Sequence, residues 1–456
     1  MKKLLLLVLA TVLVMSFSFG QYQYDPSFPP GNAADTLLKG VTTHGIAVDK
    51  AGKIWVIPFA VVKGDSVLDK AGAKRDSSVK LNYPVYAIRV FNPNGTQAAF
   101  SPIKILSGAG INDTLWASGT KAVTQRGIQT DKDGNILYSS FDRVFRINST
   151  TGAAMGKLVA GGGNSITQVA ADTVGNIFTT QVSPGLGGIY MYDASFTKQG
   201  NVTDTTRFFS RTMAASKAGD KVYYGGYTGH AVIRYTGDPL FGFTADTVLK
   251  GFDCESINRH GKTDWLWAST GSGNDMPNRY PGVATAYKSH TWYLWNPADN
   301  KIKDSITWSG LGSFTLADSQ GIRPRGVATT QSGDTVYVTM FGAKAGLYSF
   351  QRFIKKSSSV SRQDGIVAGD YSLSQNYPNP FNPSTKLKFT LKNAANVSLT
   401  VYDVLGKEIS TLASGNFAAG SYDVDFNASN LSAGVYFYTL KTSNGFTQTK
   451  KMLLVK

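Results

Sequence analysis

The stretch Gly127-Ile-Gln-Thr-Asp-Lys-Asp-Gly-Asn-Ile-Leu-Tyr-Ser139 indicates how this chain folds. A short segment that begins with glycine precedes the turn Asp131-Lys-Asp-Gly134, and an apolar segment follows it. Glycine supplies the positive φ that a tight hairpin turn requires, and Ile and Tyr are frequent in strands. The stretch therefore predicts two antiparallel strands joined by a tight turn.

The same hairpin recurs along the chain. Its second strand appears as Lys53-Ile-Trp-Val-Ile, Asn135-Ile-Leu-Tyr-Ser, Asn176-Ile-Phe-Thr-Thr, Lys221-Val-Tyr-Tyr-Gly, Asp264-Trp-Leu-Trp-Ala and Thr335-Val-Tyr-Val-Thr. Six copies of a four-stranded unit predict an all-β, six-bladed β-propeller over residues 21–354, with small residues on the crowded innermost strands. The pattern resembles the NHL-like and other six-bladed propellers, a resemblance of architecture that carries no activity by itself.

The outermost strand of each blade is expected at a recurring apolar segment. These segments are Ile103-Lys-Ile-Leu, Lys157-Leu-Val, Arg207-Phe-Phe, Thr247-Val-Leu-Lys and Ser305-Ile-Thr-Trp. The sixth blade lacks a following copy, and Thr36-Leu-Leu-Lys near the N-terminus matches the pattern instead. This predicts that an N-terminal strand completes the last blade, which leaves no open sheet edge.

Long connections gather on one face of the predicted propeller. They cover residues 60–85, 107–125, 271–290 and 309–324, whereas the tight Asp/Gly turns emerge on the other face. Insertions on one face usually mark the binding side. The residues that enter the innermost strands from this face are His44, Arg126, Thr167, Arg211, Glu255 and Arg325.

His44, Arg126, Arg211, Glu255 and Arg325 are therefore the ligand-binding candidates. Guanidinium groups bind carboxylate, sulfate or phosphate in a bidentate manner, so this channel mouth could hold an anion. The alternative is a structural network in which Glu255 pairs with a neighbouring arginine.

Signatures of catalysis and metal binding are largely missing. The sequence holds neither Gly-x-Ser-x-Gly nor His-Glu-x-x-His, and its four histidines are dispersed. Asp131-Lys-Asp-Gly134 resembles the start of a calcium loop, but Ile136 departs from that pattern and a plain hairpin turn is favoured. We expect no catalytic residue, metal or cofactor. The alternative is an extracellular hydrolase or lyase acting on a carbohydrate or lactone, in which Glu255 works with a second carboxylate.

The start of the chain resembles a secretory signal peptide. Lys2 and Lys3 precede an apolar run, and the small residues Ser18-Phe-Gly20 suggest cleavage after residue 20. No later segment has the length of a membrane-spanning helix. The net charge of +16 comes without Lys/Arg runs or aromatic-basic motifs, so a nucleic-acid partner is not expected.

Composition changes again near the C-terminus. Residues 355–370 are polar and predict a linker, and alternating apolar positions in residues 371–456 predict a small β-sandwich. This last segment contains Tyr377-Pro-Asn-Pro-Phe-Asn-Pro-Ser-Thr-Lys386, Val401-Tyr-Asp-Val-Leu-Gly406, Leu431-Ser-Ala-Gly-Val-Tyr-Phe437 and Lys451-Met-Leu-Leu-Val-Lys456.

Together and in this order, these motifs resemble the type A sorting domain of type IX secretion cargo. The resemblance implies an immunoglobulin-like fold, recognition by the outer-membrane translocon and sorting machinery, and release or surface attachment of the cargo. We therefore expect an extracellular or surface-attached binding protein, with an anionic glycan or a surface protein as its partner.

Overall fold

The computed structural model describes most of the chain as β-structure. The described residues are 22–25, 28, 38, 41–68, 82–116, 125–160, 165–270, 287, 290–308, 323–341, 350–355, 360–363 and 369–455, apart from 60, 167, 184, 186, 207, 227, 228, 407, 429 and 430. The predicted signal peptide, Thr167 and most of the long connections lie outside them. Two compact units are present: Tyr22–Ile354 forms one, and Lys355–Lys456 belongs to the other.

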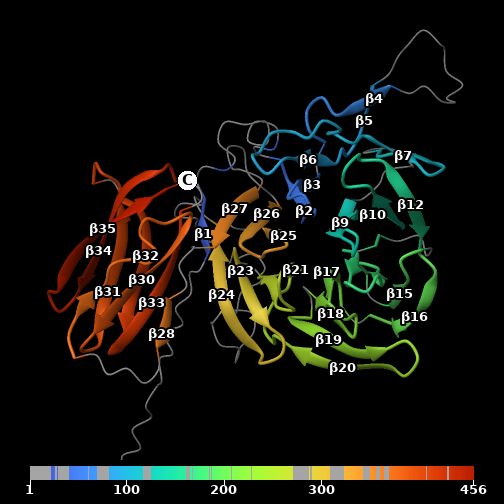
Figure 1. Ribbon diagram of the computed structural model, residues 1–456. Helices are drawn as coiled ribbons and strands as arrows, with labels where there is room; N and C mark the ends of the chain where they lie inside the picture. Colours follow the sequence, from blue (N-terminus) through green and yellow to red (C-terminus); the bar gives the residue numbers. More distant parts are fainter. Residues whose placement is uncertain are drawn as a thin grey trace, which may run out of the picture. The chain divides into compact units, whose positions relative to one another are not determined.

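The main sheets of the first unit follow one another along the chain (Figure 1). They are β2-β3-β6 (Thr43–Val48, Ile54–Pro58, Arg89–Phe91), β9 to β12 (Gln125–Thr130, Ile136–Ser140, Arg143–Ile147, Ala154–Val159), β13 to β16 (Ala170–Ala171, Ile177–Thr180, Ile189–Tyr192, Lys198–Thr203), β17 to β20 (Ser210–Ala215, Lys221–Gly226, Ala231–Asp238, Gly242–Val248), β21 to β24 (Ser256–Arg259, Leu266–Ser269, Thr291–Asn296, Lys301–Thr307) and β25 to β27 with β1 (Arg323–Thr329, Thr335–Phe341, Phe350–Lys355, Tyr22–Tyr24). Two short hairpins, β4-β5 (Ser66–Leu68, Asn82–Pro84) and β7-β8 (Ile105–Gly108, Ile111–Thr114), accompany them.

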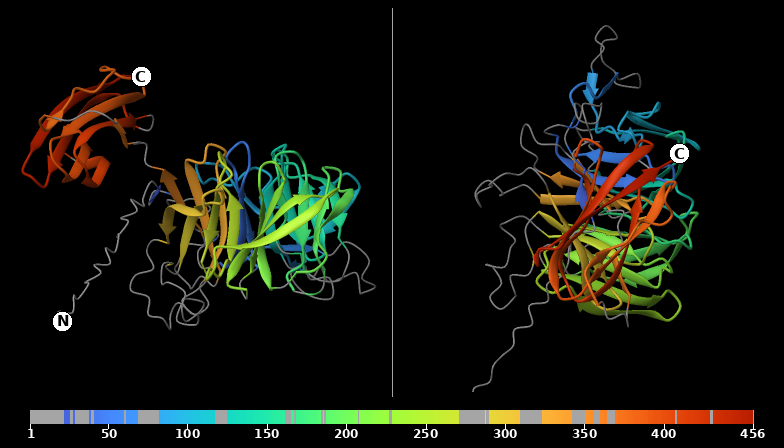
Figure 2. Two further views of the ribbon diagram at one scale, coloured as in Figure 1. Left: turned by 90° about the horizontal axis from the view of Figure 1, so that it is seen from below. Right: turned by 60° about the vertical axis from the view of Figure 1, so that its left-hand side comes forward.

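The first strands of these sheets meet one another. β2 contacts β9, β9 contacts β13, and the contacts continue through β17, β21 and β25 back to β2. The left view of Figure 2 shows the strands of this unit running between two opposite faces. Small residues permit the close approach, because a Cβ on Gly127 would lie 2.3 Å from the Cα of Gln168.

Tight turns follow the first strands, as the sequence predicts. In the turn after β9, the Gly134 N–H donates to the carbonyl of Asp131, and Gly134 has a φ of 87°. A Cβ at Gly134 would also meet the aliphatic part of Lys50 at 2.5 Å. The turn therefore needs glycine both for its backbone conformation and for its contact with the preceding sheet.

An N-terminal strand does complete the last sheet, but not at the predicted segment. β1 pairs with β27, the Asp25 N–H donates to the carbonyl of Arg352, and the Tyr22 hydroxyl donates to the carbonyl of Gly333. The Tyr22 ring is also buried against Trp267. β1 thus occupies the position that was predicted for Thr36-Leu-Leu-Lys, a segment of which only Leu38 lies within the described residues.

Two other outer strands differ from the sequence prediction. The segment at Ile103 joins the first sheet through a bridge between Ile88 and Ile103, and its next residues, from Ile105 on, pair within the hairpin β7-β8 instead. In the third sheet, β16 takes the outer position that was predicted for Arg207-Phe-Phe. A polar outer strand is tolerated there because one face of an outermost strand lies in solvent.

The second unit consists of two four-stranded sheets around one core. Their orders are β28-β33-β30-β29 (Val360–Gln363, Gly420–Asn427, Ser384–Leu391, Ser372–Leu373) and β32-β31-β34-β35 (Glu408–Phe417, Ala395–Tyr402, Gly434–Thr442, Thr447–Leu454). Leu387, Phe389 and Leu391 alternate along β30 and are fully buried in this core. β28 lies within the segment predicted as linker and pairs with β33.

A glycine at the β1 contact offers a stability test. Gly333 has a φ of 75°, and a Cβ there would lie 2.2 Å from the His260 ring. We expect Gly333→Ala to lower the free energy of unfolding by about 1–3 kcal/mol more than Gly242→Ala, which adds a Cβ at a φ of 84° with nothing within 4 Å. Denaturant unfolding measures both. Equal losses would show that the His260 contact adds nothing to the backbone cost.

Candidate functional site

Side chains from the first strands of five sheets, or from the residue directly before such a strand, converge at the end where these strands begin. We call this cluster the arginine mouth. It contains the five predicted candidates and one residue that the sequence analysis missed: His44, Arg126, Arg211, Glu255, Arg323 and Arg325. Thr167, the remaining predicted member, lies outside the described residues. The structure therefore brings the candidates together, although they are spread over almost 300 residues of sequence.

Glu255 is the centre of this cluster. Its side chain is completely buried, and its carboxylate forms an ion pair with Arg325 and lies 3.3 Å from Arg323 and 3.6 Å from Arg211. A buried carboxylate is costly unless cations and hydrogen bonds compensate for its lost hydration. The pairing alternative considered for Glu255 is thus present in the structure. The mouth nevertheless holds more guanidinium groups than carboxylates.

His44 is a neutral member of the mouth. Its Nδ1–H donates to the carbonyl oxygen of Arg126 at 2.8 Å, which fixes the tautomer because a carbonyl can only accept. The ring packs on Phe59 and Phe341, and the Arg325 guanidinium lies 4.9 Å from the centre of the Phe341 ring. Burial and the charge of Arg126 lower the pKa of His44 to about 3.

This shift in pKa predicts an acid-sensitive fold. Below the unfolded pKa of 6.5 the unfolded chain binds a proton at His44 that the folded chain rejects, so stability should fall by about 1.4 kcal/mol per pH unit down to about pH 3. In His44→Asn, an amide can still donate to the Arg126 carbonyl but does not titrate. We expect the loss of stability between pH 7 and pH 4.5 to be about 2 kcal/mol smaller in this variant. Denaturant midpoints at the two pH values measure it, and equal losses would contradict it.

Arg323 could have been found from the sequence. Arg323 and Arg325 enter β25 two residues apart, and the pairing with β26 is irregular between Pro324 and Gly326, at Arg325. The sequence analysis assigned one residue per strand and so overlooked the Arg-Pro-Arg pattern. Beside these residues, His44, Arg126, Gln168 and Arg325 line a space of about 10 Å³. Such a space holds about one water molecule.

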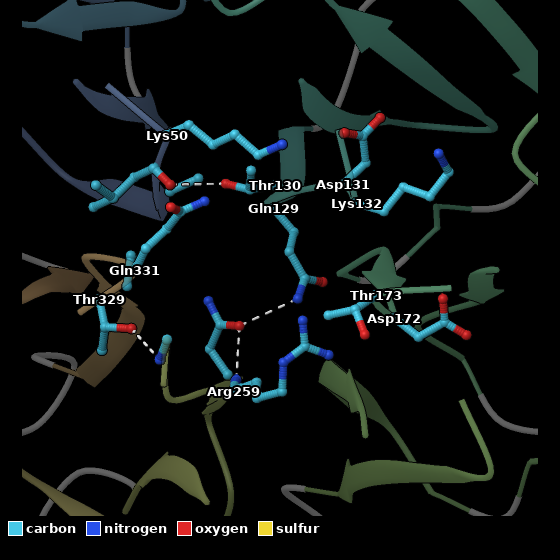
Figure 3. A pocket seen from close by; sticks show the side chains of 15 residues that line it. Lys50, Gln129, Thr130, Asp131, Lys132, Asp172, Thr173, Arg259, Thr329 and Gln331 are labelled. Carbon is cyan, nitrogen blue, oxygen red and sulfur yellow. Dashed lines mark hydrogen bonds between the residues drawn. The ribbon is translucent and has the colours of Figure 1, made fainter. Parts of the chain in front are cut away.

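A larger cavity lies at the opposite end of the first strands, beside the tight turns, and we call it the turn-side cavity (Figure 3). Its volume is about 360 Å³, and its wall includes Lys50, Gln129, Lys132, Asn258, Arg259 and Gln331. This cavity was not predicted from the sequence, because the insertions on the other face were taken to mark the binding side. The polar residues at the ends of the first strands could have indicated this cavity.

The turn aspartates beside this cavity have structural roles. Asp131 accepts hydrogen bonds from the backbone N–H groups of Asp133 and Asn135 and pairs with Arg146. Asp172 accepts from the corresponding turn backbone and from the Asn176 side chain. These contacts fit the hairpin interpretation of Asp131-Lys-Asp-Gly134. Within the described residues, no group of three His, Cys, Asp or Glu side chains is arranged to hold a metal ion.

The remaining histidines and the cysteine are engaged elsewhere. His230 pairs with Asp253, and His260 contacts Tyr22 and Thr263. Cys254 is buried, and burial raises the pKa of its thiol. A thiol held in its protonated form is a poor nucleophile. Among the described residues, no helix has the length and apolar character to cross a membrane.

Similarity to known proteins differs between the chain as a whole and its C-terminal unit. No curated protein matches the chain. Among solved structures, the chain is similar to a luciferin-regenerating enzyme, at 11% identity and a TM-score of 0.41, with 70% of this chain and 92% of that chain covered. It is also similar to Raptor of Chaetomium thermophilum, at 9% identity and a TM-score of 0.40, with 71% of this chain and 29% of that chain covered.

The match that bears on function lies in residues 375–456, which fit the family described as the secretion system C-terminal sorting domain. This domain directs proteins to the type IX secretion machinery, as the motifs of the sequence predict. The chain therefore carries a type IX sorting domain at its C-terminus, and the protein is exported to the extracellular space or the cell surface.

Proposed function

We propose that the first unit is a closed six-bladed β-propeller that binds an anionic ligand outside the cell, at the arginine mouth. The order of contacts between first strands, from β2 through β25 and back to β2, supports closure, and the pairing of β1 with β27 supports a ring joined by both ends of the unit. In this proposal residues 1–20 are a signal peptide, 21–354 the propeller, 355–370 a connecting segment and 371–456 the sorting domain.

An immunoglobulin-like fold for the sorting domain has support from two tyrosines. The Tyr422 hydroxyl donates to the carbonyl of Ala418, and the Tyr436 hydroxyl donates to the carbonyl of Ser432, each four residues upstream. Such a bond from a tyrosine to the backbone shortly before it is a feature of immunoglobulin-like sandwiches. In this proposal the sorting domain directs export, and the propeller binds the ligand.

The charge balance of the arginine mouth carries the proposed binding function. Three arginines, Arg211, Arg323 and Arg325, engage the carboxylate of Glu255. Arg126 adds a fourth cation beside His44, which is neutral. Arg211 and Arg323 retain 20% and 25% of their side-chain exposure, so they can reach a ligand while Arg325 holds Glu255. A sulfated or carboxylated glycan presents anions with pairs of oxygens that guanidinium groups bind in a bidentate manner.

The enzyme alternative has less support. A two-carboxylate hydrolase needs an acid and a base across the scissile bond. Glu255 is the one carboxylate among the mouth residues described above, and three arginines engage it. An arginine-dominated mouth favours binding.

A glycan array with the full chain tests the proposal, with sulfated, carboxylated and neutral glycans in parallel. We expect acidic glycans to bind and Arg211→Gln/Arg323→Gln to lose most of that signal. Arg234→Gln is the matched control, because Arg234 has a similar exposure, pairs with Asp246 and lies on β19, away from the mouth. Equal signals from the mouth variant and the control would overturn the assignment.

A further inference from the structure

The turn-side cavity has the dimensions of a small-molecule site. Its volume of about 360 Å³ lies near the lower end of the range for ligand pockets, roughly 300–1,000 Å³. The small space that His44, Arg126 and Arg325 line at the arginine mouth has a volume of only about 10 Å³. The two sites lie at opposite ends of the same strands: β9 carries Arg126 at the mouth and Gln129 at the cavity.

Gln129 presents an unsatisfied acceptor at this cavity. The side chain is 5% exposed, its Nε2 donates to the Asn258 Oδ1 at 3.2 Å, and its Oε1 has no hydrogen-bond partner. The orientation of the amide is fixed, because the Asn258 Nδ2 donates to the carbonyl of Val327 and its Oδ1 must therefore accept. A buried acceptor without a partner is costly, and a ligand hydroxyl would satisfy it.

Arg259 presents a positive charge beside this acceptor. Figure 3 shows the Arg259 guanidinium and the Gln129 amide pointing toward each other in the middle of the cavity. The Nη1 of Arg259 donates to the carbonyls of Ala171 and Ala215, which hold the group in place. None of the ion pairs formed by the described residues includes Arg259. Burial lowers its pKa, while Asp264 and Asp172 act in the opposite direction through space.

Two lysines add to the positive charge at the cavity wall. Lys50 and Lys132 both line it, and each lies along the turn glycine of the following sheet, Gly134 or Gly175. The turn aspartates Asp131 and Asp172 also line it, but hydrogen bonds within their own turns occupy their carboxylates. Lys132 is shared with Asp133 at 2.8 Å, so Arg259 and Lys50 are the cations whose charge is most available to a ligand.

We propose that the turn-side cavity binds a monosaccharide-sized sugar acid, with its carboxylate on Arg259 and the two lysines and a hydroxyl donating to Gln129. A neutral sugar would leave the guanidinium without a counter-charge, and a simple anion would leave Gln129 without a donor. Free uronic acid and the terminal residue of an acidic polysaccharide share this chemistry. This site is separate from the arginine mouth and does not depend on the function proposed for it.

Isothermal titration of the full chain with galacturonate, trigalacturonate, galactose and sulfate tests this site. In the Arg211→Gln/Arg323→Gln chain, in which the arginine mouth is inactivated, we expect one uronate to bind per chain, and galactose and sulfate to bind at least about tenfold more weakly. Stronger binding of galacturonate would assign the free acid, and stronger binding of trigalacturonate the polysaccharide end. Binding of neither uronate would overturn the proposal, and equal binding of sulfate would overturn the sugar-acid class.

Variants assign the binding to named groups. Gln129→Glu keeps the shape of the side chain but gives Arg259 a carboxylate partner and removes the donor to Asn258, so uronate affinity should fall by about a hundredfold. Lys50→Ala/Lys132→Ala, which alters exposed side chains, should weaken binding about tenfold. Lys262→Ala is the control on the same face outside the cavity wall, and Arg211→Gln/Arg323→Gln should also bind normally. Wild-type affinity in both cavity variants would overturn the site.

Discussion

Replacing Glu255 by leucine should lower the free energy of unfolding of the first unit by about 3–5 kcal/mol. The substitution keeps a similar volume but removes the carboxylate that compensates Arg325 inside the structure, where the side chain of Arg325 is 1% exposed. Arg211 and Arg323 lose their counter-charge at the same time. Buried cations left without an anion are among the costliest single changes in a protein.

The chain supplies its own control for this prediction. Its other glutamate, Glu408, is exposed on β32, where its carboxylate accepts a hydrogen bond from Thr411. We expect Glu408→Leu to change stability by less than about 0.5–1 kcal/mol. Guanidinium denaturation is followed by tryptophan fluorescence for the first unit and by far-ultraviolet circular dichroism for both units, so that each variant is measured in its own unit. Similar midpoints for the two variants would show that Glu255 is not a structural counter-ion.

Leu454→Asp in the sorting domain should abolish delivery to the cell surface. Leu454 is 1% exposed at the end of β35, pairs with Gly434, and adjoins Phe381 through a bridge. Losing the buried side chain costs about 2–5 kcal/mol, and burying a carboxylate costs more, against a total domain stability of about 5–15 kcal/mol. The unfolded domain would no longer present its motifs to the secretion machinery.

Fractionation of producing cells measures this effect. The variant should accumulate in the periplasm, on the inner side of the outer membrane, whereas the wild-type chain should reach the outside of the cell. Thr447→Asp is the control, because Thr447 is exposed on the same strand and lies outside the motif Lys451–Lys456. Normal export of Leu454→Asp would mean that the folded sandwich is not what the machinery recognises.

The sequence predicts the strands well wherever a local pattern decides them. Ile136, Leu137 and Tyr138 are fully buried in β10, and the glycines of the tight turns have positive φ. Outer strands are harder to predict, because their residues are half-exposed and their position depends on pairing rather than on apolar content. That is why β16, with the sequence Lys-Gln-Gly-Asn-Val-Thr, was missed.

The arginine mouth was accessible from the sequence because repeats align equivalent positions. Aligning the first strands is enough to place Arg126, Arg211, Glu255 and Arg325 at one end of them. The turn-side cavity was not accessible in this way. Its character depends on which acceptors the turns already occupy, as at Asp131, and on a hydrogen-bond chain from Gln129 through Asn258 to Val327. Such pairings join residues that are distant in sequence and leave no local signal.

The pairing of β1 with β27 has a consequence for how the chain is made. Tyr22–Tyr24 must wait until Phe350–Lys355 has been synthesised before the last sheet can form, which places a contact of very high sequence separation late in folding. A chain that is broken off early, or trimmed past Tyr22, would retain an uncovered sheet edge that can pair with other chains. The same contact thus distinguishes complete from incomplete copies, and limited proteolysis of the N-terminal strand should increase the self-association of the protein.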